Sequence, residues 1–352
     1  MESLLKEWDG ENTIISYDKP TGAWIFIAIF STLLGPAAGG TRMKHYSDFQ
    51  SALQDALRLA EAMTYKFALS GISFGGGKTV IAIPCDFDTQ SRHALLRRYG
   101  EMVQKLGGLF FSGPDVGMSS TDMDIISETG SPYVFGCTPE AGGAGSSGPA
   151  TALGVFSGIQ VACEHVFGQK SLNGRRVLVQ GAGSVGGALI EYLRSAGADV
   201  MFSDVEEKSI CRFRDDFNLQ CISAEKVYSV ECDIFAPCAL GAVLNSKTIP
   251  QLKCRVVAGG ANNQLAEPED AKRLKDRGIL YAPDYVINVG GAMFLVGTET
   301  QDWTQEHMEN EVTDGIQNVL QHIFELSAIK DITTEAAARQ VAEKRLSSVT
   351  YL

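Results

Sequence analysis

The sequence predicts an α/β protein with two domains separated by a cleft: an N-terminal α/β domain and a C-terminal, doubly wound domain of Rossmann type. With 352 residues, the chain exceeds the usual size of a single domain. Strand-like and helix-like segments alternate along its first part, which is typical of α/β proteins. A strand, a glycine-rich turn, a helix and a second strand follow one another between residues 175 and 204.

The composition argues against several classes of function. Hydrophobic residues make up 45% of the chain and charged residues 20%, as in ordinary soluble proteins. A net charge of −12 disfavours binding to the phosphate backbone of nucleic acids. The apolar run 23–34 is shorter than the roughly 20 residues that a spanning helix needs, and the acidic N-terminus does not resemble a signal peptide. We therefore expect a cytoplasmic protein with neither a nucleic-acid nor a membrane partner.

The residues that most often bind transition metals form no recognisable pattern. The eight cysteines include no CxxC pair, and the five histidines include no HExxH motif. We expect free thiols in a reducing compartment and no metal site.

In the first part of the chain, hydrophobic periodicity predicts two strands and two helices. The strands are Trp24–Phe30 and Thr79–Ile83, and the helices are 48–63 and 91–106. The glycine- and serine-rich cluster 141–148 then interrupts the pattern, which indicates a hinge or domain boundary.

The second part contains further alternating elements. They are a helix at 151–166, the strands 234–236, 255–258 and 279–282, a helical region from Thr304 onward, and a last helix at 333–346. We expect a first domain over residues 1–144, rejoined by C-terminal helices at about 329–352. The second domain is then the dinucleotide-binding domain, over residues 145–328.

The segment 175–204 has the features of a dinucleotide-binding unit. A buried strand leads into the loop that contains Gly181, Gly183, Ser184, Val185 and Gly186. The glycines permit a tight turn, close approach of the backbone to a pyrophosphate, and tight packing of the next helix. The pyrophosphate would lie at the N-terminus of that helix. The alternative is a tight turn that binds nothing.

The second strand of this unit ends at an acidic residue, Asp204. An acid at this place accepts hydrogen bonds from the adenosine ribose and repels a 2′-phosphate, so we expect NAD rather than NADP as the cofactor. Its alternative role is that of a helix cap.

Two lysines in the first part lie close to glycines. The helix predicted at 48–63 would end in the segment that leads to Lys66. Lys78 follows the run Gly75–Gly77 just before a strand. Exposed backbone N–H groups and lysine charges can together hold a carboxylate. A phosphate-binding NTPase loop is disfavoured because its first glycine would fall at Ile72. Ordinary surface lysines remain the alternative.

Seven separated segments resemble the Glu/Leu/Phe/Val amino-acid dehydrogenase family, in its leucine, phenylalanine and tryptophan branch. The resemblance extends over residues 24–346. The segments are Gly35–Arg42, Met63–Lys66, Phe74–Lys78, Asp115–Gly117, Ala236–Ala239, Ala261–Gln264 and Tyr281–Gly291.

The resemblance implies how the substrate and the cofactor are held. Lys66 would hold the substrate carboxylate, together with the backbone at Gly39 and Gly40 and the amide of Asn262. Further residues would lie along the cofactor: Cys238, Ala239, Ala261, Asn262 and Asn288. For Asn262, a structural role in a turn is the alternative.

The resemblance also implies the chemistry. Lys78 would act through a water molecule as the general base, and Asp115 would relay protons to and from the amino group. The reaction would be the NAD-dependent oxidative deamination of an L-amino acid, closed off from bulk water by closure of the cleft. A non-catalytic NAD-binding regulator would have lost these residues, and the chain keeps Lys66, Lys78 and Asp115. The resemblance further implies a homo-oligomer, which we expect to be a dimer.

The hinge departs from the family pattern. The chain has Gly145-Ser146-Ser147-Gly148-Pro149 where the family usually has an asparagine or aspartate at the second position and a further proline. We expect a looser hinge but not a loss of activity.

Substrate choice depends on residues that match the side-chain pocket of the leucine enzymes. They are Ala38, Gly113, Ala292 and Leu295, and most are smaller than in the leucine branch. A wider pocket favours an aromatic substrate, tryptophan first and phenylalanine second, over leucine or valine. The stretch 233–245 also resembles tryptophan-oxidising members, including that of scytonemin synthesis. The alternative is that Met293 or Phe294 refills the space, which would favour a branched-chain substrate.

Overall fold

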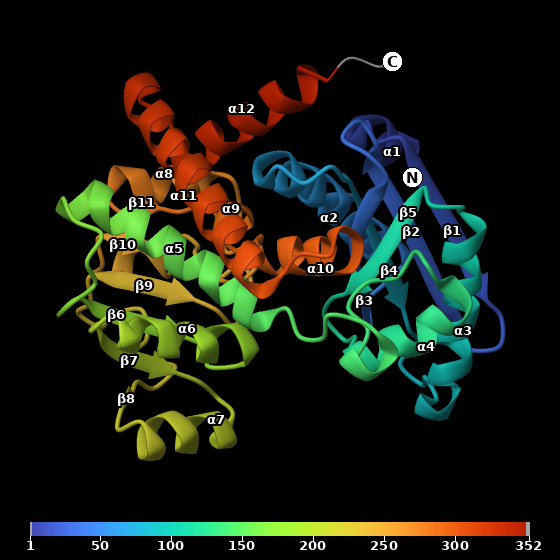
Figure 1. Ribbon diagram of the computed structural model, residues 1–352, viewed down its shortest axis with the longest axis horizontal. Coiled ribbons are helices and arrows are strands. Elements are labelled where there is room, and N and C mark those ends of the chain that lie inside the picture. Colours follow the sequence, from blue (N-terminus) through green and yellow to red (C-terminus); the bar gives the residue numbers. More distant parts are fainter. Residues whose placement is uncertain (1, 350–352) are drawn as a thin grey trace. The chain divides into compact units, whose positions relative to one another are not determined.

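The computed structural model describes residues 2–349, which form two compact units (Figure 1). Unit 1 contains the residues up to Ser146, Leu295–Asp302, and the chain from Ala342 onward. Unit 2 contains Ser147–Phe294 and Trp303–Val341. We expected residues 329–341 in the first domain and residues 295–302 in the second. The structure places 329–341 in unit 2 and 295–302 in unit 1.

Unit 1 is a mixed sheet between helices. Its elements are α1 (Glu2–Trp8), β1 (Asn12–Asp18), β2 (Ala23–Ser31), β3 (Ala37–Lys44), α2 (Phe49–Ser70), β4 (Gly75–Ala82), α3 (Arg92–Lys105), β5 (Phe110–Pro114) and α4 (Ser120–Gly130). The sheet order is β1-β2-β4-β3-β5, with β3 parallel to both β4 and β5. Strand β3 therefore has β4 on one side and β5 on the other, which brings residues that are far apart in sequence close to β3 from both sides.

Helix α2 begins and ends with recognisable caps. The side chain of Asp48 accepts a hydrogen bond from the backbone N–H of Ser51 at 2.7 Å, and Gly71 ends the helix with φ = 83°. The helix is therefore longer than its periodicity predicted, and the expectation that it ends at Lys66 is wrong. Lys66 lies inside it, one turn before the end.

The glycines before Lys78 are part of strand β4 and do not form a loop. A Cβ atom on Gly76 would lie 2.1 Å from the backbone nitrogen of Thr64 in α2, and one on Gly77 would lie 2.8 Å from the ring of Phe110. Glycine thus lets the helix pack directly against the sheet. The strand predicted at Thr79–Ile83 therefore begins four residues earlier, at Gly75.

Unit 2 is a parallel sheet with helices. Its elements are α5 (Gly148–Phe167), β6 (Arg176–Gln180), α6 (Ser184–Ser195), β7 (Asp199–Ser203), α7 (Glu207–Cys211), β8 (Gln220–Cys221), β9 (Ile234–Pro237), β10 (Val256–Val257), α8 (Glu269–Asp276), β11 (Leu280–Tyr281), α9 (Asp284–Ile287), α10 (Gly290–Gln301), α11 (Gln305–Lys330) and α12 (Thr334–Ser347). Helices α10 and α12 continue from one unit into the other.

The strand order of unit 2 is β11-β10-β9-β6-β7-β8, with every pair parallel. The chain runs outward from β6 to β8 on one side and from β9 to β11 on the other. The topological switch point therefore lies between β6 and β9, where open α/β sheets bind ligands at the carboxyl ends of their strands. The predicted two-domain α/β fold with a Rossmann-type second domain is confirmed.

Helix α5 has the length and apolar composition of a membrane-spanning segment, alone among the helices within residues 2–349. In this structure it packs against α6 and α11 in the core of unit 2.

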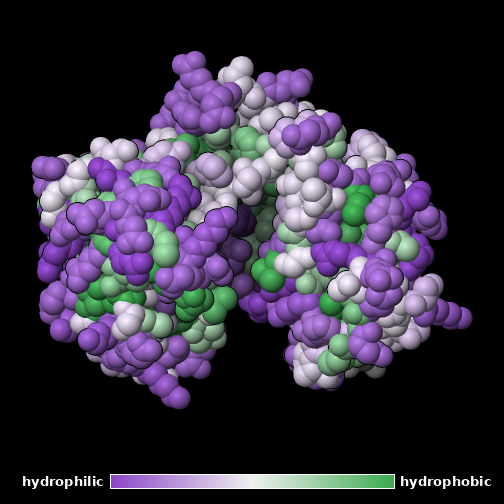
Figure 2. All heavy atoms as spheres, turned by 90° about the horizontal axis from the view of Figure 1, so that it is seen from below, coloured by the Kyte–Doolittle hydropathy of each residue, from purple (hydrophilic) through white to green (hydrophobic). Residues whose placement is uncertain are grey.

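Figure 2 shows hydrophilic side chains over most of the visible face, with hydrophobic ones in small scattered groups.

Candidate functional site

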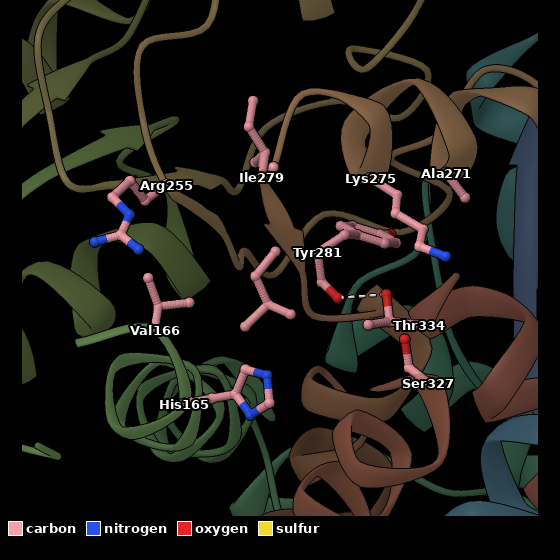
Figure 3. Close-up of a pocket in the computed structure, with 11 residues that line it drawn as sticks. His165, Val166, Arg255, Ala271, Lys275, Ile279, Tyr281, Ser327 and Thr334 are labelled. Atoms are coloured by element: carbon pink, nitrogen blue, oxygen red, sulfur yellow. Dashed lines mark hydrogen bonds between the residues drawn. The ribbon is translucent and has the colours of Figure 1, made fainter. Parts of the chain in front are cut away.

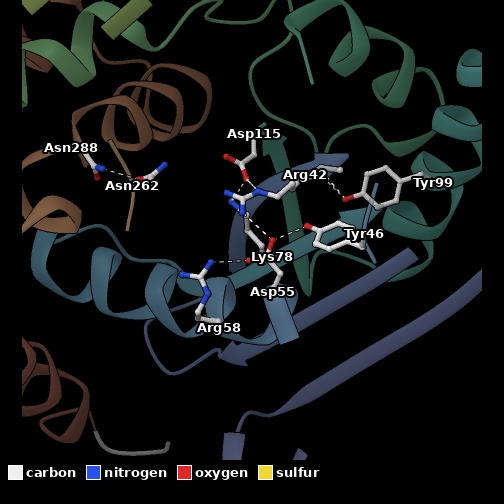
Figure 4. Close-up of polar contacts among 11 residues, drawn as sticks. Arg42, Tyr46, Asp55, Arg58, Lys78, Tyr99, Asp115, Asn262 and Asn288 are labelled. Atoms are coloured by element: carbon white, nitrogen blue, oxygen red, sulfur yellow. Dashed lines mark hydrogen bonds and ion pairs between the residues drawn. The ribbon is translucent and has the colours of Figure 1, made fainter. Parts of the chain in front are cut away.

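Lys78 and Asp115 form a buried ion pair in unit 1 (Figure 4). The ammonium of Lys78 lies 3.0 Å from Oδ2 of Asp115, and Lys78 is only 5% exposed. Lys78 is in the middle of β4, and Asp115 follows the last residue of β5. The structure thus brings together two of the three residues expected to be catalytic.

Arg42, on β3, reaches the same carboxylate. Its Nε donates to Oδ2 of Asp115 at 2.9 Å, so two cations share one oxygen. Burial alone would raise the pKa of Asp115, but the charges of Lys78 and Arg42 outweigh it and lower that pKa to about 2. Asp115 is therefore an ionised carboxylate in this arrangement.

Arg42 is itself held by a second carboxylate, Asp55 on α2. Nη1 of Arg42 donates to Oδ2 of Asp55 at 3.0 Å, and the hydroxyl of Tyr46 donates to the same oxygen at 2.7 Å. Arg58 binds the other oxygen of Asp55 at 2.8 Å. Sequence reasoning missed this network. One signal was available: residues alternate along a strand, so Arg42 shares a face with Gly40.

Gly39 and Gly40 lie inside strand β3. A Cβ on Gly40 would lie 2.8 Å from that of Asp115 and 3.2 Å from Nζ of Lys78, and one on Gly39 would lie 1.8 Å from the carbonyl oxygen of Gly77. Only glycine fits at either position. Without a side chain at Gly40, the ion pair of Lys78 and Asp115 can close directly over this strand.

Lys66 lies on α2, partly buried. Two residues before it lies Thr64, and the backbone of Thr64 packs against Gly76 of β4. Lys78 lies two residues after Gly76. The two lysines therefore lie on neighbouring elements that meet at Thr64 and Gly76.

Four buried hydroxyl groups join the strands on the opposite face of the sheet. The hydroxyl of Tyr99 lies 2.8 Å from those of both Thr41 and Thr79 and 2.9 Å from that of Ser112, while Thr41 and Ser112 are 2.7 Å apart. These residues come from α3, β3, β4 and β5. The cluster therefore fixes the three strands that carry Gly40, Lys78 and Asp115 relative to one another.

Of the four expected side-chain pocket residues, Ala38, Gly113 and Leu295 belong to unit 1. Register places Ala38 beside Phe111, and Gly40 beside Gly113, on the same face of the sheet as Lys78. A Cβ on Gly113 would meet nothing closer than Cβ of Phe135, at 4.0 Å, so the space above it is open. Ala292 belongs to unit 2.

Three phenylalanines that the sequence did not single out lie beside this space. Phe111 stacks on Phe135 with ring centroids 5.3 Å apart, and Phe74 meets both rings edge-on at 5.3 and 5.9 Å. Aromatic pairs prefer such stacked and edge-to-face arrangements. The open space over Gly113 thus has an aromatic border.

The loop that carries Phe135 is fixed by Glu299. Its carboxylate accepts hydrogen bonds from the backbone N–H groups of Gly136, at 3.0 Å, and Ala144, at 2.8 Å. Burial raises the pKa of Glu299, although both hydrogen bonds act in the opposite direction. A Cβ on Gly136 would lie 3.7 Å from Leu295, which places that residue at the same loop.

In unit 2, the loop between β6 and α6 has the geometry that its sequence predicted. Gly181 has φ = 92°, and a Cβ on Gly186 would lie 1.8 Å from the carbonyl oxygen of Gly181, so both positions require glycine. A Cβ on Gly183 would meet no atom within 4 Å. At that position the backbone faces open space at the N-terminus of α6, where a pyrophosphate could approach it.

Residues from the end of β9 lie beside this loop, at the switch point. A Cβ on Gly181 would lie 2.7 Å from that of Ala239, and one on Gly186 would lie 3.2 Å from that of Cys238. A Cβ on Gly260 would contact Val185 at 2.6 Å. The backbone N–H of Ala261 donates to the carbonyl of Pro237 at 2.9 Å, which holds the next loop at the same edge of the sheet.

Two further helix N-termini meet the loop. A Cβ on Gly148, the first residue of α5, would lie 2.0 Å from Oγ of Ser184. Near the start of α10, a Cβ on Gly291 would lie 2.3 Å from Oγ1 of Thr151 on α5. The first turns of α5, α6 and α10 therefore lie together, and the positive ends of their helix dipoles favour an anionic ligand.

Asp204, at the end of β7, is joined to the glycine loop. Its Oδ2 accepts a hydrogen bond from the backbone N–H of Ala182 at 2.6 Å, and its Oδ1 accepts from the N–H groups of Val205 and Glu206. The carboxylate therefore lies next to the loop, where the sequence placed the ribose acid.

Asn262 and Asn288 contact each other. Nδ2 of Asn288 donates to Oδ1 of Asn262 at 2.7 Å and lies 3.3 Å from the carbonyl oxygen of Gly260 (Figure 4). Asn262 is exposed and Asn288 is buried. Asn288 thus orients the exposed amide at the edge of the sheet that carries the glycine loop.

A cavity of about 340 Å³ opens elsewhere in unit 2 (Figure 3). Arg255 and Ile279, which line it, precede β10 and β11, so it lies at the edge of the sheet opposite the glycine loop. Two of its polar groups already have partners within the protein: Lys275 binds Asp331, and the hydroxyl of Thr334 donates to the carbonyl of Tyr281. Within residues 2–349, no three histidine, cysteine or acidic side chains are grouped as metal ligands would be.

Comparisons with known proteins match the whole chain. The family model described as "Glu/Leu/Phe/Val dehydrogenase, dimerisation domain" matches residues 20–131, and that described as "Glutamate/Leucine/Phenylalanine/Valine dehydrogenase" matches 142–207 and 202–351. Leucine dehydrogenase of Geobacillus stearothermophilus is 41% identical over 98% of this chain and 93% of its own length. Phenylalanine dehydrogenase of Lysinibacillus sphaericus is 38% identical over 96% and 88%. The crystal structure of L-tryptophan dehydrogenase from Nostoc punctiforme superposes with a TM-score of 0.83, at 37% identity over 99% of both chains.

Proposed function

This chain belongs to the Glu/Leu/Phe/Val dehydrogenase family and is an amino-acid dehydrogenase, and we propose that it oxidises an aromatic L-amino acid with NAD. The reaction converts the amino acid, NAD and water into the 2-oxo acid, ammonium, NADH and a proton. The observation that carries the proposal is the buried pair of Lys78 and Asp115 over Gly40, beside the open space at Gly113.

Substrate binding is assigned to unit 1 and to one amide of unit 2. Lys66 holds the α-carboxylate by charge, together with the backbone at Gly39 and Gly40. The exposed amide of Asn262, oriented by Asn288, adds a hydrogen bond.

Proton transfer is assigned to Lys78 and Asp115. To act as a base, Lys78 must first release a proton, and Asp115 lies within hydrogen-bond distance of its ammonium. Lys78 then removes a proton from the water molecule that attacks the imine carbon. Its positive charge afterwards stabilises the negative charge that develops on the carbinolamine oxygen.

The residues of unit 2 fit a nicotinamide dinucleotide. Bound there, this cofactor would supply the acceptor for the hydride that the substrate loses. The open backbone at Gly183 and the converging helix N-termini suit the pyrophosphate, while Val185, Cys238, Ala239 and Ala261 border the switch point. Asp204 supports the choice of NAD, because its carboxylate beside the glycine loop would repel a 2′-phosphate.

The border of phenylalanines supports an aromatic substrate. An indole or phenyl ring in the space over Gly113 would have Phe111 and Phe135 as stacking or edge-on partners. Tryptophan is our first candidate, with indole-3-pyruvate as its product, as in scytonemin synthesis, and phenylalanine is the second. Branched-chain oxidation of leucine or valine is the alternative, supported by relatives of both kinds.

We further propose that residues 1–144 bind the substrate and mediate assembly of a cytoplasmic homodimer, and that residues 145–328 bind the cofactor. The description of the family model for residues 20–131 as a dimerisation domain supports the assembly. Light scattering at several protein concentrations tests it, and a monomer at all of them would contradict it.

One assay tests the activity and the substrate together. NADH formation is measured at alkaline pH with a panel of L-amino acids, each with NAD and with NADP. We expect the highest kcat/KM with tryptophan or phenylalanine and NAD. Turnover of leucine and valine alone would overturn the aromatic assignment. No turnover with any amino acid would overturn the activity and leave the non-catalytic regulator.

A further inference from the structure

Arg42 has contacts that the proposed roles do not explain. It is only 9% exposed, lies two residues beyond Gly40 on β3, and bridges two carboxylates that belong to different elements. Its Nε binds Asp115 beside Lys78, and its Nη1 binds Asp55 on α2. A buried guanidinium with two anionic partners has a single orientation, because its donors form a rigid planar fork.

We propose that Arg42, held by Asp55, is a positioning residue that controls where the proton lies between Lys78 and Asp115. The inference rests on the proposed function, because it assigns these two groups to proton transfer. Arg42 does not touch substrate in this assignment and acts only through Asp115.

The geometry explains how this control works. Lys78 and Arg42 both bind Oδ2 of Asp115, so the carboxylate balances two positive charges. When Lys78 passes its proton to Asp115, it loses its charge, and Arg42 is the cation that remains in contact with the carboxyl group. The charge of Arg42 then favours the ionised form of Asp115 over the protonated form, and so favours release of the proton from Asp115. Two sites this close titrate as a pair.

Asp55 and its partners keep Arg42 in place. Tyr46 and Arg58 donate to Asp55, and their hydrogen bonds and the charge of Arg42 lower its pKa despite burial, so it stays ionised. Burial and the neighbouring Asp55 raise the pKa of Tyr46, so its hydroxyl remains a donor. Asp55 also reduces the positive field that Arg42 exerts on the proton pair.

The signs of these charges give opposite predictions for two variants. Arg42→Gln removes a cation, which makes loss of a proton from the Lys78–Asp115 pair harder. The pH at which the deamination rate is half-maximal should therefore rise, by about one unit. Asp55→Asn removes an anion but keeps a side-chain oxygen that can accept from Nη1 of Arg42, so Arg42 stays in place and this pH should fall. Arg42→Lys keeps the charge but loses the fork, so kcat should fall while the half-maximal pH stays near that of the wild type.

The test is the pH dependence of kcat for the wild type and these variants, with Arg97→Gln as the matched control. Arg97 is an arginine of the same unit that pairs with Glu128, and its side chain is 51% exposed. We expect a wild-type profile for this control. An unchanged half-maximal pH in Arg42→Gln, or shifts of the same sign in Arg42→Gln and Asp55→Asn, would overturn the proposal. If Arg42→Gln does not fold, the downward shift in Asp55→Asn decides.

A second measurement does not depend on turnover. The acetylation of Lys78 by acetic anhydride is followed against pH by peptide mass spectrometry, and its midpoint should shift with the same signs. If the wild type oxidised no amino acid, the proposed function would fail. The labelling would still show whether Arg42 controls the proton on Lys78, and an unmoved midpoint would refute that.

Discussion

Lys78 and Asp115 meet at 3.0 Å although 37 positions separate them in the chain, because their side chains reach each other over Gly40 of the intervening strand β3. Hydroxyl groups on the opposite face of the sheet hold the three strands together. The site is therefore preorganised within unit 1. A preorganised charge pair costs little reorganisation during the reaction.

Removal of the amine of Lys78 should abolish turnover without loss of cofactor binding. Lys78→Ala leaves the cofactor residues unchanged, since they lie in unit 2. We expect kcat to fall at least 10³-fold, on the order of what a general base and a charge stabiliser contribute together. NADH formation measures the first effect, and calorimetric titration with NAD measures the second. A variant with wild-type rates would refute the base.

A methyl group over the aromatic border should narrow the substrate range. A Cβ at Gly113 would lie 4.0 Å from Phe135, an ordinary contact, so Gly113→Ala should fold normally. It takes volume from the proposed side-chain space. We expect the ratio of kcat/KM for tryptophan to that for leucine to fall by about tenfold. An unchanged ratio, with a melting temperature like that of the wild type, would place the substrate ring elsewhere.

Replacement of the acid beside the glycine loop should relax the choice of cofactor. Asp204→Ser removes the charge that we expect to repel a 2′-phosphate, and the ratio of kcat/KM with NADP to that with NAD should rise at least tenfold. Glu206→Gln is the control, because it removes the charge of the nearby Glu206 and leaves Asp204 in place. A strong preference of the wild type for NADP would contradict the role of Asp204.

Glu335 should make the stability of the protein depend on pH. Burial and the neighbouring Asp284 raise the pKa of Glu335 to about 7, despite a hydrogen bond from Tyr285 and the charge of Arg339. The folded state therefore binds a proton between pH 4.5 and 7 that the unfolded state has released. The wild type loses stability as the pH rises through this range.

Glu335→Gln has no proton to lose and should escape this loss. One pKa unit corresponds to about 1.4 kcal/mol. Because the side chain of Glu335 keeps some exposure to solvent, we expect a smaller effect than the full shift: on going from pH 5 to pH 8, the free energy of unfolding of the variant should rise by about 1–2 kcal/mol relative to that of the wild type. Urea denaturation at both pH values measures the difference. A gain of the same size at pH 5 and at pH 8 would show that the carboxyl does not titrate in this range.

Local patterns were enough to predict much of unit 2. The spacing of Gly181, Gly183 and Gly186 between two apolar segments specified a strand, a turn and a helix, because the demands are partly local: Gly181 has φ = 92°, and Gly186 packs against the carbonyl oxygen of Gly181. The same reasoning missed β3 and placed the start of β4 too late, because runs of glycine usually indicate loops. Their glycines serve contacts with α2, β5 and Phe110, which are distant in sequence.

The sequence by itself determined the residue types of the site, namely the two lysines, Asp115, the paired glycines and the acid at 204, and the resemblance named their chemistry. The tertiary structure decided which side chains meet. Arg42 joins Asp115 and Asp55, and Phe74, Phe111 and Phe135 gather beside Gly113, through strand pairings and helix packing between distant segments. Such contacts depend on the order of strands in the sheet, and hydrophobic periodicity does not encode that order.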